Sequence, residues 1–295
     1  MKQLLLIIAH KNVSHLEKII AAFDSSYSFY FIVDKSSELV REMERSKLSS
    51  DSRVLKINTA HKINWGSSRI VTAILDALQD VLMNHDFNYA HLISGQDFPT
   101  KGASEIAAFM SQNEGSEFIE SFSLPTSRWY LGGENRVAYY YLFDWFKARS
   151  GILRRINNIL VDIQHKLHLK RKFKPDNLQL YGGSMWWTLS KECLTYVTGY
   201  VNSHPEILKS MKHSFCSDEI LIPTIVMNSA FAEQVINDNL RYICWESRNG
   251  NFPANLDESD YDAIVASGKL FARKIEFPTS QKLVSLLSNS IHSKI

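Results

Sequence analysis

Residues 89–99 read Tyr-Ala-His-Leu-Ile-Ser-Gly-Gln-Asp-Phe-Pro, an apolar run that gives way to a polar turn at Ser94. The run at 89–93 has the length and composition of a buried strand. Other segments repeat this pattern or show the apolar spacing of a helix. The further strands are residues 3–9, 29–33 and 53–57, and the helices are residues 15–23, 39–48 and 67–85. Strands that alternate with helices predict an α/β fold, with a mostly parallel central sheet and helices on both faces.

Three of the predicted strands end in polar side chains. These ends are His10-Lys11, Asp34-Lys35-Ser36 and the turn that contains Ser94, Gln96 and Asp97. The carboxyl ends of parallel strands meet at one edge of a sheet, where such sheets bind ligands. A surface loop would also be polar, so one cluster alone identifies no site. Three clusters at the same edge indicate a ligand site there.

The composition is that of an ordinary globular protein, with 295 residues, of which 45% are hydrophobic and 22% charged. The formal net charge of +2 gives no indication of nucleic-acid binding. Cys193, Cys216 and Cys244 are few and lack metal-ligand spacing, which favours a reducing compartment. No apolar run reaches membrane-spanning length, so we do not expect an integral membrane protein. We expect one domain over residues 1–295.

The second half of the chain differs in character from the first. Residues 128–146 are dense in aromatic side chains, which either form core or offer a platform for sugar rings. Both interpretations fit the sequence. Residues 180–189, Leu-Tyr-Gly-Gly-Ser-Met-Trp-Trp-Thr-Leu, join a glycine turn to two tryptophans that lead into a strand. We expect an edge strand at residues 118–119 and the end of the ordered fold at residues 271–275.

Residues 215–226 carry the adjacent carboxylates Asp218 and Glu219 at the start of an apolar run. Ser217 is a good helix N-cap and acids in a first turn favour the helix dipole, so a capped helix start explains this pattern. The alternative is a catalytic carboxylate whose pKa apolar neighbours raise. Pro223 is disfavoured deep in a helix. The helix therefore begins near Pro223, with the acids in the turn before it, or its first turn is bent.

The segment at 91–99 resembles a signature of the core-2/I-branching enzyme and peptide O-xylosyltransferase family. Seven further landmarks come in the order that this family has. They are Ile-Ala-His-Lys at 8–11, Phe-Ile-Val-Asp-Lys-Ser at 31–36, Trp-Gly at 65–66, Tyr-Gly-Gly-Ser-Met-Trp-Trp-Thr-Leu at 181–189, Ser-Asp-Glu at 217–219, Arg-Tyr-Ile-Cys-Trp at 241–245 and Phe-Ala-Arg-Lys-Ile at 271–275. The resemblance extends from residue 3 to about residue 277.

The resemblance implies a GT-A fold and an inverting glycosyltransferase that uses UDP-N-acetylglucosamine or UDP-xylose. The half up to about residue 120 would bind the nucleotide, and the half from about residue 121 would bind the acceptor and carry catalysis. Glu219 matches the base of the family. Asp218 beside it would position the acceptor, or tune Glu219 by like-charge repulsion. Arg273 and Lys274 match the residues that hold the diphosphate.

The other residues expected to bind the UDP-sugar fall into two groups. The nucleotide side comprises His10, Asp34, Trp65, Ser94, Gln96 and Asp97. The binding site of the donor or acceptor sugar would be lined by Trp186, Trp187 and Trp245, although core packing explains Trp187 equally well.

We expect no divalent metal and no other cofactor. Most GT-A enzymes bind a metal through an Asp-x-Asp pair after the fourth strand, where this chain has the single carboxylate Asp97. Asp260 and Asp262 form a literal Asp-x-Asp, but they follow Ser259 and are better explained as first-turn acids of a helix. The histidines show no metal-ligand spacing.

Family members of the secretory pathway carry a membrane anchor and many cysteines, and this chain has neither. It therefore resembles a compact bacterial type. That implies a cytoplasmic enzyme of surface polysaccharide or glycoconjugate synthesis, with a glycan or lipid-linked glycan as acceptor. The alternative is a nucleotide-sugar-binding partner protein without turnover.

Residues 147–174 hold nine basic side chains and one acid, Asp162. The basic residues are Lys147, Arg149, Arg154, Arg155, Lys166, Lys170, Arg171, Lys172 and Lys174. Isoleucine and leucine recur at helical spacing from Ile152 to Leu167. The pattern predicts an amphipathic helix that rests on the anionic inner face of the cytoplasmic membrane. A solvated helix packed on the catalytic core is equally compatible with the sequence.

Overall fold

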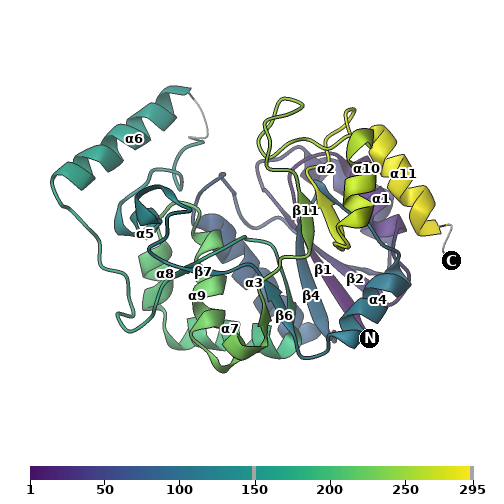
Figure 1. The fold of residues 1–295 in the computed structure, drawn as a ribbon, viewed down its shortest axis with the longest axis horizontal. Coiled ribbons are helices and arrows are strands. Elements are labelled where there is room, and N and C mark those ends of the chain that lie inside the picture. Colours follow the sequence, from purple (N-terminus) through teal and green to yellow (C-terminus); the bar gives the residue numbers. More distant parts are fainter. Residues whose placement is uncertain (148–150, 293–295) are drawn as a thin grey trace.

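Seven strands form the central sheet within residues 1–147 and 151–292, the part of the chain that the computed structural model describes (Figure 1). Their order across the sheet is β10-β6-β9-β4-β1-β2-β3. They are β1 (Gln3–Ala9), β2 (Tyr27–Val33), β3 (Val54–Asn58), β4 (Tyr89–Ser94), β6 (Glu117–Ile119), β9 (Trp187–Ser190) and β10 (Val235–Ile236). The pairs β1–β2, β1–β4 and β2–β3 are parallel, whereas β9 is antiparallel to β4 and β6. The predicted α/β fold with a mostly parallel sheet is confirmed.

Helices cover both faces of this sheet because successive side chains of the central strands point to opposite sides. Leu4 and Leu6 of β1 join the core on one face, and Leu5 and Ile7 join the core on the other. The first core is covered by α3 (Arg69–Asn84), α7 (Lys191–Ser203), α8 (Glu206–Met211) and α9 (Leu221–Met227). The second is covered by α1 (Val13–Ala21), α2 (Leu39–Glu44), α4 (Ala103–Gln112), α10 (Tyr261–Ala266) and α11 (Gln281–His292).

Two sequence-based expectations about the sheet and its termini are wrong. β6 is not an edge strand, because β10 pairs with it on the outer side. The ordered fold does not end at residues 271–275, because α11 follows. Leu283, Val284 and Leu287 of α11 are buried in the second core. Their spacing of one and three residues places them on one side of a helix, which explains why this segment packs.

A small second sheet brings the end of the chain to the polar edge of the first. It has the order β11-β12-β5, from β11 (Arg241–Ile243), β12 (Phe271–Arg273) and β5 (Asp97–Pro99). β12 and β5 are antiparallel, with Arg273 opposite Asp97. A third sheet pairs β7 (Phe122–Ser123) with β8 (Tyr181–Gly182). The motif at 271–275 therefore lies beside the turn that follows β4.

The aromatic segment around α5 (Asn135–Ala138) divides between core and surface. Tyr139, Tyr141 and Phe143 are buried and pack with Phe215. The interleaved Tyr140, like Trp145 and Phe146, is about half exposed. Core formation is therefore confirmed for the buried set.

Candidate functional site

A cavity of about 400 Å³ opens at the polar edge of the central sheet. Eight of the eleven residues expected to bind the UDP-sugar line it, from six separate segments of the chain. They are His10, Asp34, Trp65, Ser94, Gln96, Trp186, Arg273 and Lys274. The cavity is also lined by Ile8, Ala9, Ile63, Asn64, Ile70, Lys147 and Met185. The convergence of His10, Asp34 and Ser94 follows from the parallel pairing of β1 with β2 and β4.

Asp34 holds the loop that carries one wall of the cavity. Its Oδ1 accepts hydrogen bonds from the backbone N–H of Ile63 (3.1 Å) and of Ser36 (3.1 Å). Two residues beyond Ile63, Trp65 packs edge-on against Phe143 and Phe215, with ring centroids 5.9 and 5.5 Å away. About half of the Trp65 side chain remains exposed. These contacts fix the position of the ring at the cavity.

His10 and Gln96 line the cavity beside residues 274–276. Desolvation lowers the pKa of His10, and the neighbouring charges of Lys11 and Lys274 lower it further. The imidazole is therefore neutral at neutral pH. Gln96 donates through Nε2 to Glu276 (2.6 Å), which also pairs with Lys11 (2.5 Å).

Arg273 supplies a buried cation to the cavity. Its guanidinium lies 4.3 Å from the ring centroid of Trp186, and its Nε is 3.7 Å from the carboxylate of Asp97. Burial lowers its pKa, which the charges of Asp97 and Glu219 oppose. Its Nη1 is buried and has no hydrogen-bond partner. A buried N–H group without a partner is costly, so this atom fits an anionic ligand in the cavity.

Lys274 lines the same cavity as Arg273. In an extended strand the two side chains would point to opposite faces. β12 ends at Arg273, so Lys274 lies beyond the strand. Both side chains can therefore reach one ligand in this cavity.

Asp97 does not line the cavity. Its side chain is fully buried and accepts from the backbone N–H of Ser94 (2.9 Å) and from the Ser94 hydroxyl (2.9 Å). It therefore fixes the turn after β4 and partners Arg273. The structure gives Asp97 a supporting position rather than one facing a ligand.

Glu219 lies in a 3-10 turn, Ser217–Glu219, that precedes α9. Its carboxylate forms an ion pair with Arg136, whose guanidinium stacks on Trp129 at 3.4 Å from the ring centroid. The Glu219 side chain is 31% exposed, so part of it reaches solvent. It is not among the residues lining the cavity, but its charge acts on Arg273 inside it.

The helix-cap explanation of this segment is not what the structure shows. Cys216, not Ser217, precedes the turn, and the Ser217 hydroxyl is buried without a partner. α9 begins at Leu221, with Pro223 in its first turn. The first of the two alternatives, acids in the turn before the helix, is therefore confirmed.

Asp218 is buried beside the partly exposed Glu219. Its Oδ1 has no hydrogen-bond partner. Burial raises the pKa of Asp218 to about 7, and the charge of Glu219 contributes in the same direction. The like-charge repulsion expected between the two acids therefore acts on Asp218, which holds a proton more readily than an ordinary carboxyl.

Gly183 lies in close contact with Glu120 and with Glu219. A Cβ on Gly183 would lie 1.8 Å from the carbonyl oxygen of Glu120, a distance that no side chain tolerates. The Gly183 N–H donates to the carbonyl oxygen of Glu219 (2.9 Å). The glycine turn predicted at residues 180–189 thus contacts both Glu120 and the turn that carries Glu219.

The two remaining tryptophans do not face the cavity. Trp187 is 1% exposed and belongs to the first core, so core packing is its role. Trp245 is 64% exposed and packs against Phe252, with ring centroids 5.9 Å apart.

Within residues 1–147 and 151–292, no group of three or more His, Cys, Asp or Glu side chains could hold a metal ion. Asp260 accepts two hydrogen bonds from Arg248 (2.5 and 2.6 Å), and Asp262 lies in the first turn of α10. The literal Asp-x-Asp is therefore explained by local structure.

The partner of the Glu219 carboxylate and two residues that line the cavity were not expected from the sequence. Arg136 comes from an aromatic-rich segment and has no spacing relation to Glu219, so only the fold brings them together. Lys147 and Asn64 line the cavity from loops beside motifs that were recognised. Their position near recognised segments was the one feature of the sequence that could have indicated that they line the cavity.

The family model described as Core-2/I-Branching enzyme matches residues 5–265. The chain belongs to the Core-2/I-Branching enzyme family, a family of glycosyltransferases, as its motifs predicted. The GT-A type of α/β fold expected for such enzymes agrees with the sheet and helices described above.

Several curated proteins are similar to this chain. Xylosyltransferase 2 of Canis lupus familiaris is 22% identical over 304 residues, covering 96% of this chain and 33% of its own length. Xylosyltransferase oxt of Drosophila melanogaster is 23% identical over 243 residues, covering 78% and 24%. The xylosyltransferase of Ciona intestinalis is 22% identical over 311 residues, covering 98% and 34%. The chain thus spans about a third or less of these relatives.

Among solved structures, S. aureus TarS aligns with 40% of this chain and 21% of its own, at 12% identity and a TM-score of 0.29. A likeness of this size carries no argument about fold or function.

Proposed function

We propose that this protein is an inverting glycosyltransferase that moves a sugar from a UDP-sugar to an acceptor hydroxyl. The observation that carries the proposal is the unpartnered, buried Nη1 of Arg273 in a cavity that Lys274 also lines. Two cations at the carboxyl edge of a parallel sheet fit a nucleoside diphosphate. N-acetylglucosamine and xylose are the proposed sugars, the second supported by the names of the relatives.

In this proposal the diphosphate binds to Arg273 and Lys274. The planar guanidinium, held against Trp186, suits bidentate contact with phosphate oxygens, while lysine acts as a point charge. The nucleoside would occupy the part of the cavity near His10, Asp34 and Trp65. When the bond between the anomeric carbon and the β-phosphate oxygen breaks, the electron pair remains on that oxygen, next to the cations.

Glu219 acts as general base in the same step. Its carboxylate takes the proton of the acceptor hydroxyl while the hydroxyl oxygen forms the new bond to the anomeric carbon. Arg136 orients that carboxylate through their ion pair. Asp218 is buried beside it, and the charge of Glu219 favours its protonated form.

The proposal needs no divalent metal, because the side-chain cations stabilise the charge that develops on the diphosphate.

We further propose that the enzyme works in the cytoplasm, in contact with the inner face of the cytoplasmic membrane, where surface polysaccharide or glycoconjugate precursors are built. The acceptor in this proposal is a glycan or lipid-linked glycan that approaches the partly exposed side chain of Glu219.

Thermal-shift measurements with a panel of UDP-sugars, against the matching GDP- and CMP-sugars, test this proposal. Stabilisation by UDP-sugars alone is expected, since ligand binding to the native state raises the melting temperature. Sugar transfer by the same preparation separates an enzyme from a binding partner without turnover. Stabilisation by no nucleotide sugar would overturn the proposal.

A further inference from the structure

The helix α6 (Gly151–Lys166) lies at the periphery of the molecule, apart from the helices that cover the sheet (Figure 1). Of its side chains, only Asn157 and Val161 are buried. Asn157 accepts from the backbone N–H of Leu142 (2.8 Å), and Gln164 exchanges hydrogen bonds with the backbone of Tyr140. Asn157, Val161 and Gln164 are spaced four and three residues apart, so one side of the helix attaches it to the protein.

Beside this attached side runs a stripe of exposed isoleucine and leucine. Its members, with exposed fractions from 37% to 73%, are Ile152, Leu153, Ile156, Ile159, Leu160 and Ile163. Leu167, which continues the stripe just past the helix, is 62% exposed. One side of the helix packs on the protein, where Val161 joins Tyr139, Tyr141 and Phe143, while the apolar stripe stays exposed.

The charges of this region are segregated from those of the rest of the chain. Residues 147–174 carry nine Lys and Arg against one Asp, with Arg149 outside the described residues. The remaining 24 basic and 30 acidic side chains make the rest of the chain net negative. An anionic surface would therefore attract this segment and repel the rest, which selects one orientation of the molecule.

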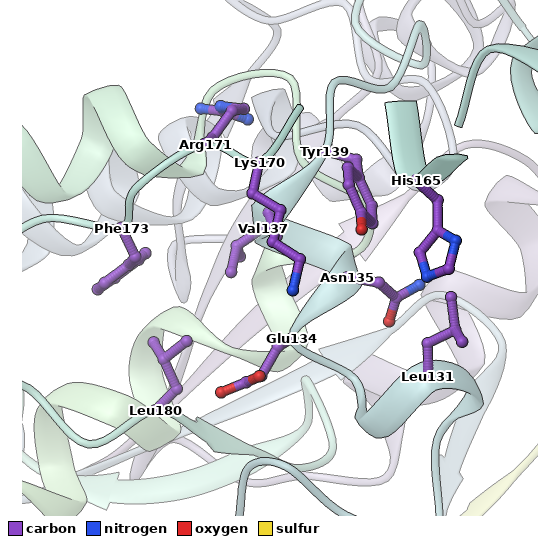
Figure 2. A pocket seen from close by; sticks show the side chains of 11 residues that line it. Leu131, Glu134, Asn135, Val137, Tyr139, His165, Lys170, Arg171, Phe173 and Leu180 are labelled. Atoms are coloured by element: carbon purple, nitrogen blue, oxygen red, sulfur yellow. The ribbon is translucent and has the colours of Figure 1, made fainter. Parts of the chain in front are cut away.

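The segment that follows α6 places cations next to apolar surface. A groove of about 580 Å³ is lined by Leu160, Ile163 and Leu169, together with Lys170 and Arg171. Figure 2 shows Lys170 and Arg171 on this segment, with His165 of α6 across a second cavity of about 320 Å³. Apolar side chains beside cationic groups match a lipid, with acyl chains next to an anionic headgroup, better than they match nucleic acid.

We propose that α6 and the segment to Lys172 form a docking surface for an anionic lipid bilayer. The isoleucine and leucine stripe enters the boundary of the acyl chains while the flanking lysines and arginines contact the headgroups. The helix lies along the surface, because within residues 1–147 and 151–292 no helix has the length and apolar character to cross a bilayer.

This orientation brings the donor cavity to the membrane. The Arg154 guanidinium of α6 lies 5.6 Å from the ring centroid of Trp65, and Lys147, just before α6, lines the cavity itself. The biological role of this docking rests on the proposed function, because a membrane-attached acceptor would then face the site of sugar transfer. Docking itself requires neither donor nor turnover.

Co-sedimentation of the full chain with vesicles of equimolar phosphatidylglycerol and phosphatidylcholine tests the docking surface, with pure phosphatidylcholine vesicles as reference. The wild type is expected to bind the anionic vesicles more tightly. An Ile156→Glu, Ile163→Glu variant and an Arg155→Ala, Lys166→Ala, Lys172→Ala variant should each lose about tenfold or more in affinity. All five positions are exposed, so the variants should keep the wild-type melting temperature.

Matched controls use exposed positions on the far helices. Val265→Glu with Leu286→Glu, on α10 and α11, should leave vesicle binding unchanged. Absence of wild-type binding at low salt, or equal binding by the Ile156→Glu, Ile163→Glu variant, would overturn the proposal. The proposal would also be overturned if the wild type formed dimers that the Ile156→Glu, Ile163→Glu variant does not form, or if it bound RNA and not vesicles. UDP-sugar binding in solution, measured on the same variants, should be unaffected and reports separately on the proposed function.

Discussion

A Glu219→Gln substitution keeps the size of the side chain but removes its ability to accept a proton. We expect turnover to fall by about 10²-fold or more, the usual scale of general base catalysis. UDP binding should change little, because Glu219 does not line the cavity. Steady-state transfer rates and UDP affinity measure the two effects. Glu44→Gln, on the exposed face of α2, is the matched control, and near wild-type transfer by Glu219→Gln would remove the residue from its role.

Asp218 makes stability depend on pH in a definite direction. Its pKa is about 7 in the folded protein, above the value of about 3.9 for an exposed aspartate. A raised pKa in the folded state means that its favourable contribution is complete below about pH 4. That contribution is lost as the pH rises through about 7, because the unfolded state loses its proton first.

Asp218→Asn removes this titration and keeps the shape of the side chain. The melting temperature of the variant relative to the wild type should therefore rise as the pH is raised from about 4 to about 7. Comparison of the two proteins cancels other buried acids, such as Glu117, whose pKa is also raised to about 7. A difference that is constant over this range would show that Asp218 ionises normally.

At the scale of an element, the turn between β8 and β9 depends on Gly183. Gly183→Ala would force its Cβ to 1.8 Å from the Glu120 carbonyl oxygen, so the backbone must shift. We expect a loss of roughly 1–3 kcal/mol in the free energy of unfolding, the usual cost of overpacking, and a loss of turnover, because Gly183 bonds to Glu219.

Gly199→Ala in α7 is the control for Gly183→Ala. A Cβ at Gly199 meets nothing within 4 Å, so alanine should stabilise this helix by up to about 1 kcal/mol. Denaturant unfolding of both variants gives the comparison. Equal effects of the two substitutions would mean that the close approach at Gly183 does not constrain the fold.

At the scale of the whole molecule, hydrophobic periodicity and the order of strands and helices were enough to predict the sheet and the residues at its edge. His10, Asp34 and Ser94 follow parallel strands, so their meeting at one edge needed only the alternation of strands and helices. The pairing of β12 with β5 could not be predicted in this way, because it joins residues far apart in the chain. That pairing buries Asp97 behind Arg273.

Contacts between residues far apart in the chain also could not be predicted from the sequence. Arg136 pairs with Glu219 and lies over Trp129, whose ring a Cβ on Gly182 would approach to 2.6 Å. These contacts join residues far apart in the chain. The exposed stripe on α6 has the same periodicity as a packed helix, and only the structure shows which side is covered. Periodicity predicts an amphipathic helix but not the partner of its apolar side.

The binding of UDP in excess EDTA, measured by calorimetry on the wild type and on Arg273→Ala, Arg273→Lys and Lys274→Ala, tests the central claim most directly. Wild-type binding should persist without divalent metal. Each alanine variant should lose about 1.5–3 kcal/mol, the cost of a charge-assisted contact, and Arg273→Lys should lose less than Arg273→Ala. Lys282→Ala, on the exposed face of α11, should bind as the wild type does. Binding abolished by EDTA and restored by manganese, or unchanged in both alanine variants, would contradict a donor site built from these two cations.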